Sequence, residues 1–409
     1  FGQNNSGSPY SRYGIGLLPD NFGIYTAMGG VSAAMRDAYN INYLNPASYT
    51  ALDSMRFYFQ VGMNGEYVYV STTKAHTDYT AGQNGSINMA FRIIPKLYAS
   101  FGFNERTDIG YDLIYLKPMI GDENQYSYQR LEGEGGLNDA YLGLAYQFGK
   151  LSVGVNAVLL FGKLEERETI SRIAYIDGMF DQSGYYIRTR TRNQIHDFIF
   201  TLGAQYPFKI KNNTLMLGAA GNFGTYVGGY NKFEAYKYSM SSSAAAQINN
   251  DVLDDGKVFY PSRVTFGGAY EFKNKRWLVS GDYTFQNMSQ YKEFGDKTED
   301  FEGYHKVAVG GYFQPDETGR YWWQRNKYMA GGYFTRSHLF LKEHYINSFG
   351  ITLGMQMPLQ IASQALLLGF SIDGGIRGTE ANTLIKEQYI KVRINIAFKE
   401  LWFAKRKIN

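Results

Sequence analysis

The sequence predicts an all-β protein: a transmembrane antiparallel β-barrel of about 14 strands with an N-terminal plug, or hatch, inside its lumen. Three observations predict this fold. Glycine (46 residues) and tyrosine (36) are abundant, whereas cysteine is absent. Apolar and polar residues alternate with a period of two over stretches of about ten residues, which is the length of a tilted strand that crosses a bilayer. Short and long connections also alternate along the chain, as they do in outer-membrane barrels.

The composition excludes several other classes of protein. Without cysteine there is no disulfide framework, thiolate metal site or cysteine nucleophile. No run of roughly 18 apolar residues occurs, so a bundle of membrane-spanning helices is excluded. The net charge of +4 is small, and no basic run is longer than Lys405–Lys407, which argues against a nucleic-acid partner. We expect no cofactor.

The first 52 residues form the predicted plug. They do not alternate, and they are rich in Gly, Asn, Ala and Tyr. Fourteen strands enclose a lumen that is wider than wall side chains alone can fill, so a segment of small and polar residues is a natural filling. The chain begins at Phe1 without an initiator Met, as a mature exported chain would after removal of its signal peptide, although a trimmed sequence would begin in the same way.

Residues 53–409 form the predicted barrel, which ends in a periplasmic tail. In residues 390–398 one face carries only apolar side chains, while the other carries Lys391, Arg393, Asn395 and Ala397. A soluble sandwich also alternates, but there the charged row would face solvent, whereas in a barrel it lines the lumen. We assign seven charged residues in mid-strand positions to the lumen: Arg92, Asp197, Arg263, Glu271, Asp282, Lys391 and Arg393.

The same alternation predicts fourteen strands, an even number, as bacterial single-chain barrels have. They are expected at residues 57–72, 84–94, 96–112, 125–148, 151–172, 184–208, 214–236, 257–273, 276–288, 303–315, 325–336, 344–357, 364–375 and 386–399.

The connections predict which end of the barrel faces the cell interior. Turns around 94–96, 149–150, 209–213 and 274–275 are short. Longer loops are expected around 73–83, 113–124, 173–183, 237–256 and 289–302. Short turns are typical of the periplasmic end and long loops of the extracellular end. Aromatic residues that anchor a barrel at the interface are expected on the short-turn side, at Tyr321–Trp323 and Trp402–Phe403.

The candidate plug carries a recognisable motif. Thr26–Ala34 contains a Gly-Gly pair after small residues, and Ala38–Ser48 contains Asn45-Pro46-Ala47. This region resembles the plug of the FadL-like outer-membrane transport family, whose members show a Gly-Gly pair, a short helix and then an Asn-Pro-Ala motif. The motifs cover only about residues 26–52, but the resemblance extends to the strand count and the plug.

Five residues are candidates for shaping or gating this plug: Gly29, Gly30, Asn45, Pro46 and Ala47. The glycines permit close approach of the backbone to the wall. Pro46 disfavours helix at Asn45, so that the segment 31–39 must end before it, and the Asn45 side chain can bond its own backbone to fix a turn. A purely structural role for these residues is an equally good interpretation.

The resemblance implies passive uptake of hydrophobic molecules, such as long-chain fatty acids, through the outer membrane of a Gram-negative bacterium. Extracellular loops would capture the ligand, which would leave sideways through the wall beside a displaced plug. Candidate capture surfaces are residues 176–186, with Met179, Phe180, Tyr185 and Tyr186, and residues 236–258. An ordinary solvated rim is the alternative.

The end of the chain departs from the transporters proper. After the last strand it continues to Asn409 as a basic and aromatic tail, like FadL-like barrels from Bacteroidetes-type bacteria. Several of those serve as accessory subunits of larger outer-membrane machines, in protein secretion or barrel assembly. The second hypothesis is therefore a subunit that does not transport, with other outer-membrane proteins or lipoproteins as partners.

Neither a catalytic nor a metal site is expected. The five histidines (76, 196, 305, 338 and 344) show no zinc spacing, and no Gly-x-Ser-x-Gly elbow occurs. His196 and Asp197 are adjacent on a strand, so they point to opposite faces. Asp251, Asp254 and Asp255 lack the full spacing of a calcium loop and are interpreted as a solvated acidic turn. The expected partners are the lipid bilayer and a hydrophobic small molecule or lipid.

Overall fold

The computed structural model of the chain describes residues 7–401 apart from 14, 16–22, 120–121, 177–178, 182–183, 240–244, 298–299 and 362–363. A single antiparallel sheet forms the wall. Its first half comprises β1 (Arg56–Ser71), β2 (His76–Ile94), β3 (Leu97–Met119), β4 (Asp122–Phe148), β5 (Leu151–Ile176), β6 (Met179–Asp181), β7 (Tyr185–Ile210), β8 (Asn213–Asn222) and β9 (Thr225–Ser239).

The second half of the wall completes the barrel. It comprises β10 (Ala245–Tyr260), β11 (Arg263–Glu271), β12 (Trp277–Asn287), β13 (Lys292–Glu293), β14 (Asp296–Lys297), β15 (Gly303–Phe313), β16 (Lys327–Leu341), β17 (His344–Ile361), β18 (Gln364–Gly378) and β19 (Lys386–Leu401). Short helical turns lie between some strands: η4 (Met288–Gln290), α1 (Trp322–Arg325) and η5 (Ala381–Thr383).

The prediction of a closed barrel of fourteen strands is confirmed. β6, β13 and β14 are short pieces beside the wall, and two wall strands are each interrupted once: β8 and β9 form one strand, as do β10 and β11. Pro261, which has no N–H to donate to the ladder, stands at the second interruption. Closure comes from β1 and β19, which pair without a break from Arg56↔Leu401 to Ser71↔Lys386.

The outward rows are apolar over the lengths that a bilayer crossing requires. On β7, for example, Phe198 and Phe200 expose 57% and 56% of their surface, and the apolar row continues to Phe208. The corresponding rows cover residues 140–148 of β4 and 151–161 of β5, or roughly the 9–11 residues of a tilted strand. We call these outward rows, and their equivalents around the wall, the apolar band.

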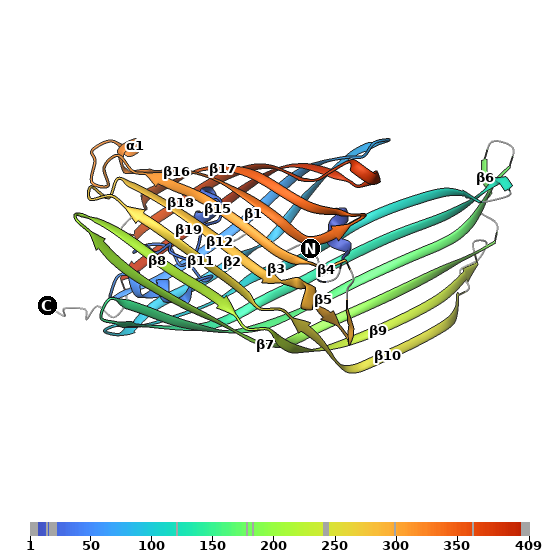
Figure 1. The fold of residues 1–409 in the computed structure, drawn as a ribbon, viewed down its shortest axis with the longest axis horizontal. Helices are drawn as coiled ribbons and strands as arrows, with labels where there is room; N and C mark the ends of the chain where they lie inside the picture. The colour runs from blue at the N-terminus through green and yellow to red at the C-terminus, as the bar shows by residue number, and fades with distance from the viewer. Residues whose placement is uncertain are drawn as a thin grey trace.

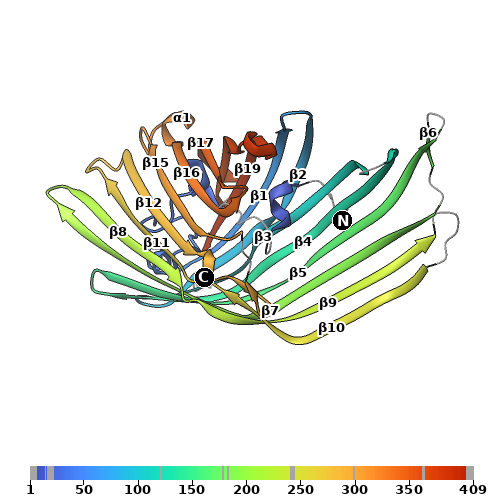
Figure 2. The same cartoon turned by 45° about the vertical axis from the view of Figure 1, so that its right-hand side comes forward.

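The predicted long loops are mostly wrong, because the strands themselves continue where loops were expected. Residues 76–83, 113–119, 237–239 and 245–256 all belong to strands. Figures 1 and 2 show β4, β5, β7, β9 and β10 running far beyond the rest of the wall. We call this region the extension; it comprises residues 104–119 of β3, 122–138 of β4, 162–176 of β5, 185–196 of β7, 227–239 of β9 and 245–258 of β10.

Both borders of the extension lack a ladder partner among the described residues. β3 pairs with β2 only over residues 97–103, while the outer part of β2 pairs with β1 alone. On the other border, β10 meets the neighbouring wall segment through the single pair Phe259↔Lys292. The wall is therefore split on both sides of the extension above the apolar band.

The expected aromatic residues lie at the short-turn end. Tyr321, Trp322 and Trp323 belong to the connection between β15 and β16, which lies at the same end of the barrel as the short turns, and all three are exposed. Trp402 and Phe403 lie outside the described residues. Within the described part of the chain, no helix combines the length and the apolar character that are needed to cross a membrane.

The described part of the N-terminal region lies against the inner face of the wall (Figures 1 and 2). It contains three short helical turns, η1 (Pro9–Arg12), η2 (Ile24–Met28) and η3 (Pro46–Ala51). Wall glycines make room for it: a Cβ on Gly310 would lie 2.3 Å from the Met28 carbonyl oxygen, and one on Gly218 would lie 1.9 Å from that of Ala33. The backbone of the N-terminal segment thus packs directly against the backbone of the wall at these glycines.

A substitution at Gly310 tests this fit. We expect Gly310→Ala to destabilise the protein by about 1–3 kcal/mol, because the new methyl meets fixed backbone atoms of Met28. The matched control is Gly374→Ala, since a Cβ at Gly374 meets nothing within 4 Å. Heat-dependent gel mobility measures stability, and limited proteolysis reports release of residues 24–30. Equal behaviour of the two variants would contradict the close fit.

Candidate functional site

The Gly-Gly pair closes the turn η2 against the wall. Gly29 and Gly30 have positive φ angles of 73° and 79°, which disfavour other residues. The Gly29 N–H donates to Thr352 Oγ1 at 2.8 Å, and this hydroxyl in turn donates to the Ala27 carbonyl at 3.0 Å. A Cβ on Gly29 would lie 2.6 Å from the Gly332 carbonyl oxygen. Gly29 is thus required by both the backbone path and the close approach, and Gly30 is required by the backbone path.

Asp282 holds the next stretch of the N-terminal segment. Its carboxylate lies on the inward row of β12 and accepts hydrogen bonds from the backbone N–H groups of Ser32 (2.5 Å) and Ala33 (2.8 Å). The predicted short helix after the Gly-Gly pair is absent, since residues 31–39 form turns and bends. The carbonyls that a helix would need as acceptors are bonded to side chains instead: those of Ser32 and Met35 accept from Asn42 Nδ2, and that of Ala33 accepts from Asn45 Nδ2.

Asn45 fixes the second anchor. Its Oδ1 accepts from the Ala47 N–H at 3.1 Å, which is the local bond expected from the sequence, and caps η3, whose first residue is Pro46. Its Nδ2 donates to the Ala33 carbonyl at 2.6 Å and approaches wall carbonyls of β7 and β8. Asn45 and Ala47 are fully buried. The motif therefore joins two parts of the N-terminal segment to the wall.

The remaining lumen contains paired charges. Arg393 lies 3.2 Å from Asp373, and Lys391 lies 3.3 Å from Glu66. Arg377 lies 2.9 Å from Glu387, whose other oxygen accepts from Ser8 Oγ at 2.6 Å. Buried ions persist when they are paired and hydrogen-bonded. The sequence reasoning named Lys391 and Arg393 but missed these carboxylates, although Asp373 also occupies a polar row that alternates with apolar residues.

The other predicted lumenal residues lie on inward rows but serve different contacts. The Asp197 carboxylate accepts from the Gly228 N–H at 2.9 Å, where the ladder between β7 and β9 is interrupted. Arg263 lines a small cavity together with Arg106 and Asp139. Arg92 and Glu271 are half-buried near the short-turn end of β2 and β11. These four residues do not come together as one site.

Two lumenal cavities that adjoin these contacts are small. The cavity at Tyr43, Arg106 and Asp139 has a volume of about 60 Å³, and that at His338 and Lys391 about 50 Å³. A third cavity, of about 230 Å³, lies toward the short-turn end and is lined by Tyr39, Lys327 and Gln356 among others. Pockets for drug-sized ligands typically measure about 300–1,000 Å³. A larger depression of about 560 Å³ lies on the outer face.

The connection between β12 and β15 covers the outer end of the lumen. Met288, Tyr291 and Phe301 are buried in the same cluster as Tyr49 of the N-terminal segment. β13, within this connection, carries Glu293, whose carboxylate accepts from Asn193. Burial, reinforced by the nearby Glu166 carboxylate, raises the pKa of Glu293 to about 7.

The candidate capture residues do not form one surface. Tyr185 and Tyr186 are adjacent on β7 and point to opposite faces. The Tyr185 ring lies 4.2 Å from Lys237 Nζ, whereas Tyr186 stacks on Tyr238 with ring centres 4.9 Å apart. Met179 and Phe180 belong to β6, which pairs with the end of β5, at the tip of the extension.

No group of histidine and carboxylate side chains suited to a metal ion occurs within the described residues. The interpretation of residues 251–255 as an acidic turn is wrong. They belong to β10, and the backbone there contains a register shift between Leu253 and Gly256. The extension of the strand explains the difference.

Comparisons with known proteins agree with this architecture. Residues 1–409 match the family model described as BamG. Among curated protein sequences, none matches the chain significantly.

Solved structures share the fold at low sequence identity. The chain resembles the toluene transporter TodX of P. putida at 15% identity, with 95% of this chain and 100% of TodX covered and a TM-score of 0.61. It also resembles the Ralstonia pickettii toluene transporter TbuX at 15% identity (94% and 99% covered, TM-score 0.56). The monoaromatic hydrocarbon channel CymD is 14% identical (94% and 98% covered, TM-score 0.58).

The raised pKa of Glu293 predicts a pH dependence. The pKa of about 7 in the folded protein exceeds the usual 4.5, so the neutral carboxyl stabilises the fold below the usual pKa, and this contribution is lost as pH rises through 7. We expect the melting temperature to fall between about pH 5 and pH 9 in the parent protein, and to fall less in Glu293→Gln. Thermal unfolding measured across this range checks it; identical pH profiles would contradict the assignment.

Proposed function

This chain belongs to the BamG family, and we propose that it acts as an accessory subunit of an outer-membrane protein machine, in protein secretion or barrel assembly. The observation that carries the proposal is the filled lumen. The N-terminal segment is anchored through Gly29, Asp282 and Asn45, and the lumenal cavities described above measure about 60, 50 and 230 Å³, each below the usual size of a ligand pocket. A barrel filled in this way is suited to holding partners rather than to passing molecules.

The extension supports this proposal. Unpaired strand edges expose rows of N–H and C=O groups that can pair with another chain. β10 presents such an edge on one side of the extension, and β3 presents one on the other side beyond Gly110, where the η1 turn covers it. We propose that other outer-membrane proteins or lipoproteins bind here. A role as an enzyme is not proposed.

The domain division is part of the proposal. Residues 1–52 act as a hatch, and residues 53–409 form the barrel with a periplasmic tail, as in Bacteroidetes-type relatives. The hydrogen bonds of Asn45 and Asp282 to their respective partners support the hatch role. The tail lies outside the described residues.

A second candidate function is passive uptake of hydrophobic small molecules, such as long-chain fatty acids. The wall split between β2 and β3 favours it. At this split the η1 turn covers the free edge of β3, since the Gly110 N–H donates to Ser11 Oγ at 3.1 Å. Movement of η1 and of the segment around Gly29 would open a sideways route. The solved relatives named as toluene and hydrocarbon channels share this fold.

A reversible tether separates the two functions. The chain has no native cysteine, and Thr26 Oγ1 lies 3.4 Å from Ser371 Oγ, so the double variant Thr26→Cys/Ser371→Cys places two thiols side by side. Oxidation would fix η2 to β18. We expect partner proteins to co-purify in mild detergent equally with the oxidised and the reduced form, because partner binding outside the lumen does not require the hatch to move.

The single variant Ser371→Cys serves as the control for oxidation. Recovery of the parent protein only as a free monomer would contradict the subunit proposal. Uptake of a labelled fatty acid that stops on oxidation and returns on reduction would instead support the second candidate. Absence of uptake in every form would exclude it.

A further inference from the structure

The outer face of the extension carries a basic patch directly above the apolar band. β5 and β7 pair without a register shift from Ser152↔Gln205 to Ser171↔Tyr186. The outward rows of the band therefore continue into the extension: Phe161 is followed by Lys163, Glu165 and Arg167, and Phe198 is preceded on its own row by Arg192 and Arg190. The outer surface of the wall therefore changes from apolar to positively charged just above Phe161 and Phe198.

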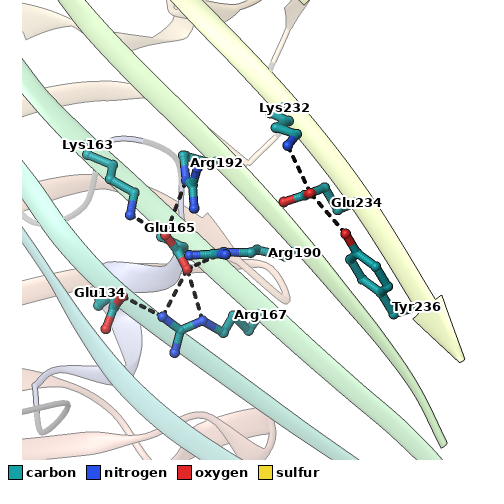
Figure 3. Close-up of polar contacts among 9 residues, drawn as sticks. All are labelled: Glu134, Lys163, Glu165, Arg167, Arg190, Arg192, Lys232, Glu234 and Tyr236. Carbon is teal, nitrogen blue, oxygen red and sulfur yellow. Dashed lines mark hydrogen bonds and ion pairs between the residues drawn. The ribbon is translucent and has the colours of Figure 1, made fainter. Parts of the chain in front are cut away.

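Four cations converge on one buried carboxylate (Figure 3). Glu165 is only 1% exposed, and its oxygens lie 2.5 Å from Arg190, 2.9 Å from Arg167 and 3.4 Å from Arg192, with Lys163 as the fourth partner. Arg167 also lies 2.6 Å from Glu134. The side chains of the three arginines and Lys163 stay 28–45% exposed. The buried Glu165 carboxylate fixes these four side chains in place, and their charged groups remain accessible to solvent.

Positive charge exceeds what the neighbouring carboxylates neutralise. Arg167 stands directly opposite Arg190 in the ladder, and Arg192 stands opposite Lys232. Like charges in directly opposed positions destabilise a sheet. Lys232 lies 2.9 Å from Glu234, which leaves Glu165 shared by four cations. An external anion bound here would relieve the repulsion.

Arg188 extends the patch in a fixed orientation. Its guanidinium lies 5.6 Å from the ring centres of both Tyr186 and Tyr238, and its Nε donates to Thr169 Oγ1 at 3.2 Å. Contacts with aromatic faces orient a guanidinium without removing its charge. Counted over the patch, six cationic side chains face four carboxylates: Lys163, Arg167, Arg188, Arg190, Arg192 and Lys232 against Glu132, Glu134, Glu165 and Glu234. Of these carboxylates, Glu132 is also paired with Arg130 at 3.3 Å.

Glu165 stays ionised in this setting. Burial acts to raise its pKa, but hydrogen bonds from Arg190, Lys163 and Arg167 outweigh burial and hold the pKa well below its usual range. The carboxylate therefore remains a permanent anchor for the arginines, rather than a group that titrates near neutral pH.

The height of the patch identifies the anion. Lys163 and Arg167 follow Phe161 by two and six residues, which places them about 5–15 Å above the end of the apolar band for a strand rise of about 3.3 Å and a tilt near 40°. The headgroup region spans about 5–7 Å on each side of the hydrocarbon core. The backbone of Lys163 therefore lies within this region, and the long arginine side chains can reach down to it from above. Arginine presents a planar fork of donors that matches phosphate oxygens, and arginines make up four of the six cations.

We propose that this patch binds the phosphate groups of phosphorylated glycolipids in the outer leaflet. The lipid chains would lie along the apolar band beside Phe161 and Phe198, and the headgroup phosphates would contact the arginines above them. This inference needs only a barrel that spans the membrane, and it holds whether the protein is a subunit or a channel. A bound lipid would also brace the extension where it leaves the membrane.

Native mass spectrometry with diphosphoryl lipid A tests the proposal on the intact chain in mild detergent. We expect Arg190→Gln/Arg192→Gln to weaken lipid A binding about tenfold or more, since two charged donors are lost. Lys74→Gln/Lys117→Gln removes the same charge from exposed residues away from the patch and should bind as the parent does. Arg190→Lys/Arg192→Lys should retain part of the affinity, and heat-dependent gel mobility shows that each variant is folded.

Three further arms identify the source of the phosphate. Dephosphorylated lipid A should bind the parent protein as weakly as diphosphoryl lipid A binds the Arg→Gln double variant. Inorganic phosphate at equal concentration should not displace lipid A. Equal affinities of parent and variant, displacement by inorganic phosphate alone, or loss of a co-purifying protein with unchanged lipid binding would each overturn the proposal.

Discussion

The fold depends on how a wide barrel keeps its interior filled. Fourteen strands enclose more space than wall side chains occupy, and each polar group that turns inward needs a partner. Asp282 meets both demands at one point, because its carboxylate satisfies two backbone N–H groups of the N-terminal segment. Glycines such as Gly310 and Gly218 then let the two backbones approach closely. The same contacts thus fill the lumen and satisfy the hydrogen-bonding groups that face it.

The wall could be predicted from the sequence because apolar and polar residues alternate along each membrane-spanning strand, and this pattern is local. The parts of the structure that were not predicted also have physical reasons. In the outer part of β10 both rows of the strand are polar, as at Asn249 and Asn250, so the contrast that marks a membrane strand disappears and a loop was predicted at residues 237–256 instead. The helix expected after the Gly-Gly pair is missing because distant wall residues fix the segment in another path: Asp282 accepts from the N–H groups of Ser32 and Ala33, and Gln205 donates to the carbonyls of Ala33 and Met35. A contact of this kind leaves no local pattern in the sequence.

A shared fold does not establish a shared function in this case. The solved relatives named as hydrocarbon channels share the architecture at about 15% identity, yet paired charges such as Arg393 with Asp373 occupy the lumen here. Charges arranged in this way favour a rigid interior. The features that reach outward are the extension, its unpaired edges and the arginines around Glu165. We therefore consider the outer surfaces of the barrel the principal site of function.

Ion conductance across a planar bilayer tests the central claim most directly, because it reports whether the lumen is closed. The account predicts that the intact chain conducts no steady current, and that Asp282→Ala, which removes the acceptor for Ser32 and Ala33, produces frequent openings. Asp78→Ala, at an exposed position on β2, should remain silent. A stable, open conductance of the intact chain would contradict the account.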